Sequence, residues 1–280
     1  MRQDRELFWS PRPGFSGEFE GKPVSINSLG LRGADVAVPK PRRQKRIACF
    51  GDSITFGYGA SDDETYAARL AQALGSRVEV VNAGVTGYTS HQVLGLLRRV
   101  GGEVSPDVAL FCIGWNDATK RPVDDRTYAR SLGLAMEVEG VASYSYLYRA
   151  AKNLYLRRAT REWKDPPRVP RVSLQRYREN LDAVVAFCRA HGTEPAFIDL
   201  PRRRRVGDAP FDRSYSAELR ALASALRVTL IDPGELGLDT PLASNEKYFI
   251  DTLHFSREGH AYLAELLSRE LVARKLFSRG

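Results

Sequence analysis

The sequence predicts an α/β protein with a parallel β-sheet that is covered by helices on both faces. Apolar runs rich in β-branched residues alternate along the chain with longer segments of helical periodicity, as successive strand–helix–strand units require. The apolar runs are continuous rather than interleaved with polar residues, which is typical of strands buried on both faces. The expected strands are residues 47–50, 78–81, 108–113, 195–200 and 228–231.

Helical patterns occupy the intervals between these strands. The last of them begins at Ser256, a residue type that caps helix amino termini, and continues with an apolar period suited to a closing helix. The expected helices are residues 64–74, 90–100, 174–191, 214–226 and about 256–276.

Two segments depart from the alternation of strands and helices. Residues 1–45 are rich in Pro, Gly and Ser, with short strand-like pieces such as 23–27, and we expect them to pack as an extension on a main domain of residues 46–280. Residues from about 118 to 174 are too many for one crossover, which predicts an insertion or lid. An aromatic and basic pattern within it, at 141–161, favours a buried amphipathic helix, with a membrane-surface or acyl-chain lid as the alternative.

The composition is that of a globular protein with a sizeable core: 280 residues, 43% hydrophobic and 27% charged. No apolar stretch reaches the roughly 18 residues needed to cross a bilayer. The amino terminus lacks the apolar core of a secretory signal, so we expect a cytoplasmic protein, with export from a longer precursor as the alternative. Cys49, Cys112 and Cys188 lie in apolar segments and are expected to be buried free thiols, as in a reducing compartment.

The net charge of +8 is concentrated in two basic runs, at residues 40–46 and 202–205. The second run follows the fourth expected strand. Arg203 and Arg204 there are candidate substrate-binding residues that would attract anionic substrates, the alternative being a solvated loop. Basic residues are patchy and no reader helix or stacking motif stands out, so no nucleic-acid partner is expected.

Nucleophilic catalysis is predicted at the carboxyl edge of the sheet, where all strand-to-helix loops of a parallel sheet emerge. Ser53 follows the first strand directly, in the turn before the next helix, and Asp251 and His254 stand three positions apart near the end of the domain. An imidazole can take the serine proton near neutral pH, and a carboxylate can orient that imidazole. The expected catalytic residues are therefore Ser53, His254 and Asp251.

An oxyanion formed at Ser53 needs hydrogen-bond donors aimed at it. A glycine N–H can be approached closely because no Cβ intervenes, and an asparagine amide offers a second donor. Gly87, after the second strand, and Asn116, after the third, are the candidates, with the Ser53 N–H as a third donor. Gly84 is assigned to turn geometry, and Trp115 is a candidate substrate-binding residue.

These segments resemble the SGNH, or GDSL-type, hydrolase family. The resemblance rests on four ordered blocks: Gly51-Asp52-Ser53, residues 82–87, Gly114-x-Asn116-Asp117 and Asp251-x-x-His254, and residues 27–33 look like a lead-in seen in bacterial members. It implies a flavodoxin-like three-layer α/β/α sandwich with a five-stranded parallel sheet. It also implies ester hydrolysis through Ser53, His254 and Asp251.

Other polar residues are assigned structural roles. Asp52 and Asp117 are expected to make structural hydrogen bonds, and His91, His191 and His260 to pack or end helices. The histidines lack metal-ligand spacing, and the glycines at 57 and 59 lack the third glycine of a dinucleotide fingerprint. No metal or organic cofactor is expected.

The sequence thus predicts a serine hydrolase that cleaves a carboxylic ester, acetyl or short-chain, of a small-molecule substrate that could be a carbohydrate or a lipid. Two alternatives remain open. An acyltransferase would use the same residues and deliver the acyl group to a hydroxyl other than water. A non-catalytic binding module would keep the same rim as a recognition site without turnover.

Overall fold

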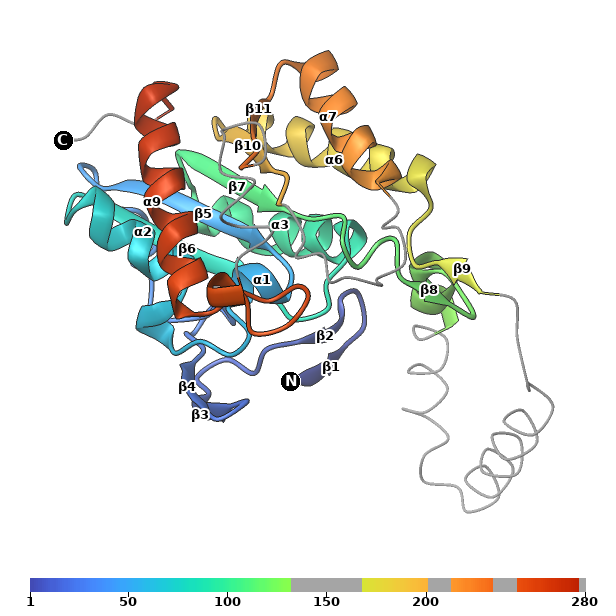
Figure 1. Cartoon of the computed structure of the whole chain (residues 1–280), viewed down its shortest axis with the longest axis horizontal. Helices are drawn as coiled ribbons and strands as arrows, with labels where there is room; N and C mark the ends of the chain where they lie inside the picture. Colours follow the sequence, from blue (N-terminus) through green and yellow to red (C-terminus); the bar gives the residue numbers. More distant parts are fainter. Residues whose placement is uncertain (132–167, 201–212, 234–245, 277–280) are drawn as a thin grey trace.

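The structure is a computed structural model that describes residues 1–131, 168–200, 213–233 and 246–276. At its centre is a five-stranded sheet in the order β11-β10-β7-β5-β6, in which every neighbouring pair is parallel (Figure 1). This confirms the predicted fold class. The strands are β5 (Lys45–Gly51), β6 (Val78–Gly84), β7 (Val108–Cys112), β10 (Glu194–Ile198) and β11 (Thr229–Ile231).

Helices cover both faces of the sheet. Alternate residues of β5 show the division: Ile47 and Cys49 pack with two helices on one face, and Ala48 and Phe50 pack with three helices on the other. Burial on both faces explains why the strand sequences are continuously apolar. The first pair is α2 (Tyr66–Leu74) and α9 (Arg257–Ala273), and the other three are α3 (Ser90–Val104), α6 (Leu174–Ala190) and α7 (Ser214–Leu226).

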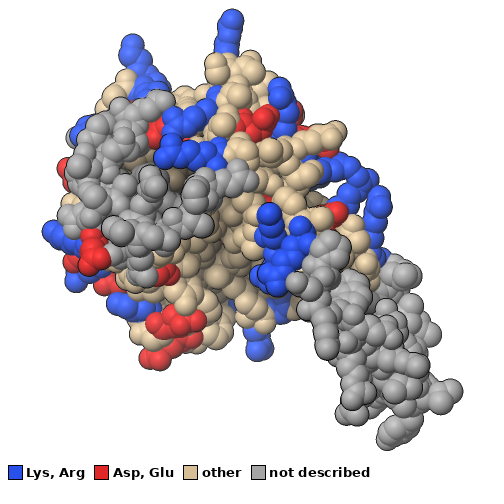
Figure 2. Space-filling model, turned by 45° about the vertical axis from the view of Figure 1, so that its right-hand side comes forward, with Lys and Arg blue, Asp and Glu red and all other residues tan. Residues whose placement is uncertain are grey.

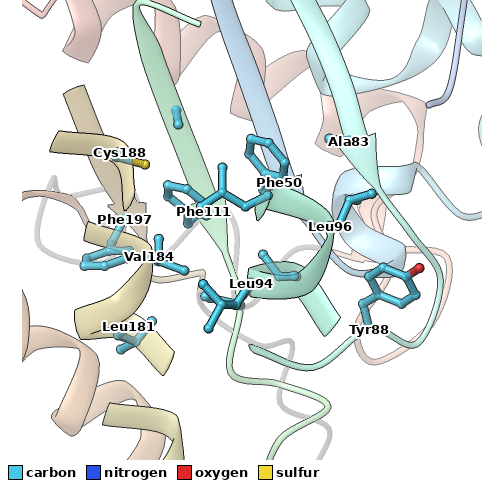
Figure 3. Packing of buried hydrophobic residues seen from close by; sticks show 14 of the residues in the cluster. Phe50, Ala83, Tyr88, Leu94, Leu96, Phe111, Leu181, Val184, Cys188 and Phe197 are labelled. Carbon is cyan, nitrogen blue, oxygen red and sulfur yellow. The ribbon is translucent and has the colours of Figure 1, made fainter. Parts of the chain in front are cut away.

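Aromatic side chains join the central strands on the α3 and α6 side. The rings of Phe50 and Phe111 stack with centroids 5.3 Å apart, and Phe197 lies 6.1 Å from Phe111. Figure 3 shows these rings facing Leu94 of α3 and Leu181 of α6. Each fully buried phenylalanine contributes about 1.5–3 kcal/mol to folding, so this row is a main source of stability for the sheet.

The strand order places a crevice beside β5. The chain passes from β5 through α2 to β6, and then returns through α3 to β7 on the other side of β5. The loops that follow β5 and β7 therefore diverge at the carboxyl edge, the position where open α/β sheets bind ligands.

Several predicted boundaries differ from the structure. The strand predicted at residues 78–81 extends to Gly84, because β6 pairs with β5 up to the Gly51–Gly84 pair. The strand predicted at 195–200 ends at Ile198, and the last helix ends at Ala273. A 3-10 turn at Asp62–Glu64 precedes α2, where the prediction began the helix.

The amino-terminal residues form two antiparallel hairpins, β1 (Arg2–Asp4) with β2 (Phe8–Ser10) and β3 (Ser16–Phe19) with β4 (Lys22–Ser25). Leu7, between the first two strands, is 1% exposed and belongs to the core cluster on the α3 side. These contacts support treating residues 1–45 as an extension packed on the domain, a division that stays a prediction.

Most of the predicted insertion, residues 132–167, lies outside the described residues, as do Arg203 and Arg204. The two described ends of the insertion meet in a short antiparallel ladder, β8 (Lys120–Arg121) with β9 (Val169–Pro170). Among the helices that the structure describes, none combines the length and the hydropathy that a membrane span requires.

Candidate active site

Ser53 is the first residue of a short helix, α1 (Ser53–Phe56), and not part of a turn as predicted. Asp52 caps this helix, with its Oδ1 accepting from the Ile54 N–H at 2.9 Å. Ser53 is buried, at 5% exposure, and it stands directly at the carboxyl end of β5. The strand and the cap together fix the position of the hydroxyl.

Two glycines allow α1 to lie directly against the sheet. A Cβ at Gly51 would lie 2.2 Å from Thr55 Oγ1, and one at Gly84 would lie 2.2 Å from the Phe56 nitrogen, both of which belong to α1. Gly84 therefore permits close backbone approach, and its assignment to turn geometry is wrong, since it ends β6 in an extended conformation.

Arg32, from the lead-in segment at 27–33, holds the other end of α1. Its buried guanidinium donates to the carbonyl oxygens of Phe56 at 2.6 Å and Gly57 at 2.8 Å, and it pairs with Asp62 at 2.9 Å. These contacts satisfy carbonyls that a helix end leaves without intrahelical partners. The lead-in segment therefore supports α1, the helix that begins with Ser53.

The three predicted catalytic residues lie in one hydrogen-bonded row. His254 Nε2 is 2.9 Å from Ser53 Oγ, and His254 Nδ1 is 2.6 Å from Asp251 Oδ2. A carboxylate only accepts, so the imidazole donates its Nδ1 proton to Asp251 and presents the Nε2 lone pair to the serine hydroxyl.

Asp251 is held by its own loop. Its Oδ1 accepts from the N–H groups of Leu253 and His254, both at 2.7 Å. Partial burial by itself would raise the pKa of Asp251, but the hydrogen bonds from the His254 ring and from these two N–H groups outweigh it and lower the pKa. Asp251 is therefore ionised at neutral pH, as an orienting carboxylate must be.

Tyr58 stacks on the His254 ring with centroids 4.4 Å apart and an interplanar angle of 30°. Its N–H donates to the Ser53 carbonyl oxygen at 3.0 Å. This tyrosine therefore contacts both His254 and α1, and it limits the rotation of the imidazole. Sequence analysis missed it, because an aromatic residue shortly after a serine carries no distinctive pattern.

The expected oxyanion donors come from three different segments, namely the start of α1 and the loops that follow β6 and β7. Within the described chain, the N–H groups of Ser53 and Gly87 have no hydrogen-bond partner, and Gly87 has a φ of +78°, which favours glycine. Asn116 Nδ2 donates to Tyr88 O at 3.0 Å and to Asp52 Oδ2 at 3.2 Å. Both amide hydrogens of Asn116 thus have protein acceptors, so Asn116 reaches an oxyanion only by sharing one of them.

Two carboxyls beside Asn116 are fully enclosed. Burial raises the pKa of Asp52 and of Asp117 to about 7 in each case. Asp117 accepts from Ser90 Oγ at 2.5 Å and from the Ser90 N–H at 3.1 Å, which ties the loop after β7 to the start of α3. Both hydrogen bonds fit the structural role that was predicted for Asp117.

The raised pKa of Asp117 predicts a pH dependence of stability. The folded chain holds this proton more tightly than the unfolded chain, whose aspartates titrate near about 3.9. The stabilising contribution is thus complete below about pH 4 and is lost as the pH rises through about 7. We expect the free energy of unfolding of Asp117→Asn, measured by urea titration, to fall less than that of the wild type between pH 5 and 8. Parallel curves would contradict this expectation.

The other histidines lie away from the hydrogen-bonded row of Ser53, His254 and Asp251. His91 stacks on Phe8, and His191 ends α6 against Phe187. His260 is 1% exposed, and its Nδ1 accepts from the Tyr66 N–H at 3.3 Å. Within the described ranges, no group of three or more His, Cys, Asp or Glu residues could hold a metal ion. All three cysteines are free and buried, as predicted.

Trp115 lines a pocket beside the hydrogen-bonded row of Ser53, His254 and Asp251. Asp52 and Ile54, which flank Ser53, and Leu253, which precedes His254, contribute to the wall of the pocket. The remaining lining residues come from the ends of β7 and β10 and from α6 and α7, and they are Cys112, Ile113, Gly114, Tyr177, Ile198, Asp199, Leu200, Tyr215, Ser216 and Leu219.

Comparisons with known proteins agree with this architecture. The solved structures of a lipase/acylhydrolase from Enterococcus faecalis, an esterase EstA from Pseudoalteromonas sp. and an acetyl xylan esterase AlAXEase are similar, at 22%, 15% and 16% identity and TM-scores of 0.51, 0.52 and 0.53. The matches cover 82%, 83% and 81% of this chain and 97%, 99% and 99% of the other chains. At these identities they show a shared fold. A search of curated proteins gives no significant match. The model of the GDSL-like lipase/acylhydrolase family matches residues 49–262, and the chain therefore belongs to this family of hydrolases that act on ester bonds.

Proposed function

We propose that this protein cleaves carboxylic esters in two steps through an acyl-Ser53 intermediate. The proposal depends on one observation above all, the 2.9 Å separation of Ser53 Oγ and His254 Nε2. A serine hydroxyl is a weak nucleophile unless a base lies within hydrogen-bonding reach. The contact of His254 Nδ1 with Asp251 supports this role for the imidazole, because it leaves Nε2 as the acceptor.

In the first step, Ser53 Oγ bonds to the ester carbonyl carbon while its proton passes to His254 Nε2. The carbonyl electron pair moves onto oxygen, where the N–H groups of Ser53 and Gly87 and the amide of Asn116 are proposed to stabilise the charge. Collapse of this intermediate breaks the ester C–O bond, and the leaving alcohol takes the proton from Nε2.

In the second step, a water molecule attacks the acyl carbon and gives one proton to Nε2. The bond to Ser53 Oγ breaks, the hydroxyl recovers its proton from Nε2, and the carboxylic acid leaves. Side chains and water handle every proton and electron pair in this route, so it requires no cofactor.

The pocket beside the row supports a short acyl group. Its lining is mostly apolar and includes Tyr177 and Leu219, which are 0% and 1% exposed. We propose that this pocket, which lies next to Ser53, accommodates a short acyl chain better than a long one. We propose that Trp115, on the rim of this pocket, contacts the substrate.

An ester series tests both parts of the proposal. We expect the wild type to hydrolyse nitrophenyl esters from acetate to palmitate with the highest kcat/KM at the short end, and Ser53→Ala to be inactive on all of them. A fluorophosphonate should label the wild type and not this variant. A folded wild type that neither hydrolyses nor is labelled would favour a binding module, and a long-chain optimum would contradict the acyl assignment.

Transfer of the acyl group to a hydroxyl other than water would use the same residues. Only the reaction products therefore distinguish it from hydrolysis. With a carbohydrate alcohol present, free acid as the main product supports hydrolysis, whereas acylated carbohydrate would identify an acyltransferase. We propose no nucleic-acid partner. On the face in Figure 2, the described Lys and Arg residues stand at several separate places with uncharged surface between them.

A further inference from the structure

The loop that carries Gly87 is held from outside by two residues that are distant in sequence. Trp9, in the amino-terminal hairpin, donates its Nε1 proton to the Thr86 carbonyl oxygen at 3.0 Å. Arg171, directly after β9, donates its Nη1 proton to the Gly87 carbonyl oxygen at 2.6 Å. Two consecutive peptide groups of this loop are therefore fixed by side chains 77 and 84 residues away.

The first of these contacts acts on the Gly87 N–H itself. The Thr86 carbonyl and the Gly87 N–H belong to one planar trans peptide group and point in opposite directions. A donor that fixes the Thr86 oxygen consequently fixes the direction of the Gly87 N–H. It also polarises that N–H, because hydrogen bonds in a chain strengthen one another.

Contacts around Trp9 make this arrangement rigid. A Cβ at Gly87 would lie 3.2 Å from Trp9 Cζ2, so the indole packs directly on the loop. Tyr88 Oη donates to the Trp9 carbonyl oxygen at 2.7 Å. The guanidinium carbon of Arg171 lies 5.7 Å from the centre of the indole ring.

Arg171 is itself held in a buried network. Its Nε and Nη2 donate to the two carboxylate oxygens of Asp125 at 2.9 and 3.0 Å, and Nη2 also donates to Gln92 Oε1 at 2.8 Å. Thr89 Oγ1 donates to Asp125 at 2.7 Å. The side chains of Arg171 and Asp125 are 9% and 7% exposed, so the pair is shielded from solvent and holds one geometry.

We propose that Trp9 and Arg171 are positioning residues that orient the Gly87 N–H for oxyanion binding, an inference that rests on the proposed function. The amino-terminal hairpin and the base of the 118–174 segment thereby take part in catalysis without touching the substrate. A residue that orients a donor affects the transition state and leaves the binding of the uncharged ester unchanged.

The test compares Trp9→Phe and Arg171→Lys with the wild type on nitrophenyl acetate. Phenylalanine keeps most of the ring contact and removes the N–H donor. Losing a whole oxyanion donor costs about 10²–10³ in kcat, so a loosened donor is expected to cost about tenfold in kcat with KM within about twofold. Active sites are counted by the end point of fluorophosphonate labelling, so that any misfolded fraction does not enter kcat.

Two further measurements separate orientation from general stability. A trifluoromethyl ketone adds to the serine and forms an oxyanion, so its Ki should rise in proportion to the loss in kcat/KM. The double variant should lose less activity than the product of the single losses, because both residues hold one loop.

Asp4→Asn is the matched control. Asp4 ties the same hairpin to α3 through Arg99 at 2.6 Å, and within the described residues it makes no hydrogen bond to Thr86 or Gly87. We expect it to lower the melting temperature and leave kcat per labelled site unchanged. An active wild type whose Trp9→Phe variant keeps its kcat per site, or loses activity only through KM, would overturn this inference alone. A wild type without esterase activity would overturn the proposed function and this inference with it.

Discussion

Replacing His254 with alanine is expected to lower kcat for ester hydrolysis by on the order of 10⁶-fold. His254 Nε2 is the ring nitrogen that contacts Ser53 Oγ, and without it the hydroxyl has no acceptor for its proton. Asp251→Asn should cost about 10⁴-fold, because an amide cannot keep the Nδ1 proton in place as a carboxylate does. Steady-state kinetics on nitrophenyl acetate measures both losses.

The catalytic row should also behave as one unit. Combining His254→Ala with Ser53→Ala is expected to cost no more than either change alone, since neither residue works without the other. His191→Ala is the matched control, because His191 is exposed at the end of α6 and contacts Phe187. Its kcat should equal that of the wild type. A His254→Ala variant with more than about a tenth of wild-type kcat would contradict the proposed role.

Replacing Gly84 with alanine is expected to destabilise the fold and reduce activity together. The new Cβ would lie 2.2 Å from the Phe56 nitrogen and 2.5 Å from the Thr55 carbonyl carbon, both in the backbone of α1. Because backbone cannot rotate away, α1 has to shift, at a cost of about 1–3 kcal/mol or more. A shift of about 1 Å at the nucleophile can cost about 10²-fold in rate. Urea unfolding and kcat measure the two effects.

Gly102 provides the comparison for this change. It is an exposed glycine in α3, and a Cβ there would have no atom within 4 Å. Gly102→Ala should stabilise the protein by up to about 1 kcal/mol, since alanine favours the helix, and leave kcat unchanged. If Gly84→Ala unfolded at the wild-type urea concentration with full kcat, the close approach of α1 to β6 would be unimportant.

The sequence was sufficient for the fold class and the family because their signals are local. Continuous apolar runs identify strands buried on both faces, and short blocks such as Gly51-Asp52-Ser53 stand where those strands end. Parallel strands then bring the ends together at one edge, which is why residues 53 and 254 could be paired across 201 positions. The catalytic roles of Ser53, His254 and Asp251 stay predictions until they are tested.

The supporting contacts were not predictable in the same way. The side chains of Trp9 and Arg171 donate to backbone carbonyl oxygens of the Gly87 loop. Every residue has a backbone carbonyl, so the sequence does not indicate which of them accepts such a bond. The strand assignment at 82–84 was wrong for a related reason. Asparagine is typical of turns, and the sequence therefore predicted that the strand ends before Asn82. In the structure, Asn82 Nδ2 donates to Phe56 O and Asn82 Oδ1 accepts from the Gly84 N–H, while the backbone of Asn82 continues the ladder with β5.

The ladder of β8 and β9 has a consequence for how this protein can vary. It closes the 118–174 stretch at its base, where Arg121 pairs with Val169. The entropy of closing a loop grows only slowly with length, by about 0.6 kcal/mol for each doubling. We therefore expect that a change in the number of residues between Arg121 and Val169 costs the fold little free energy while this stem stays paired.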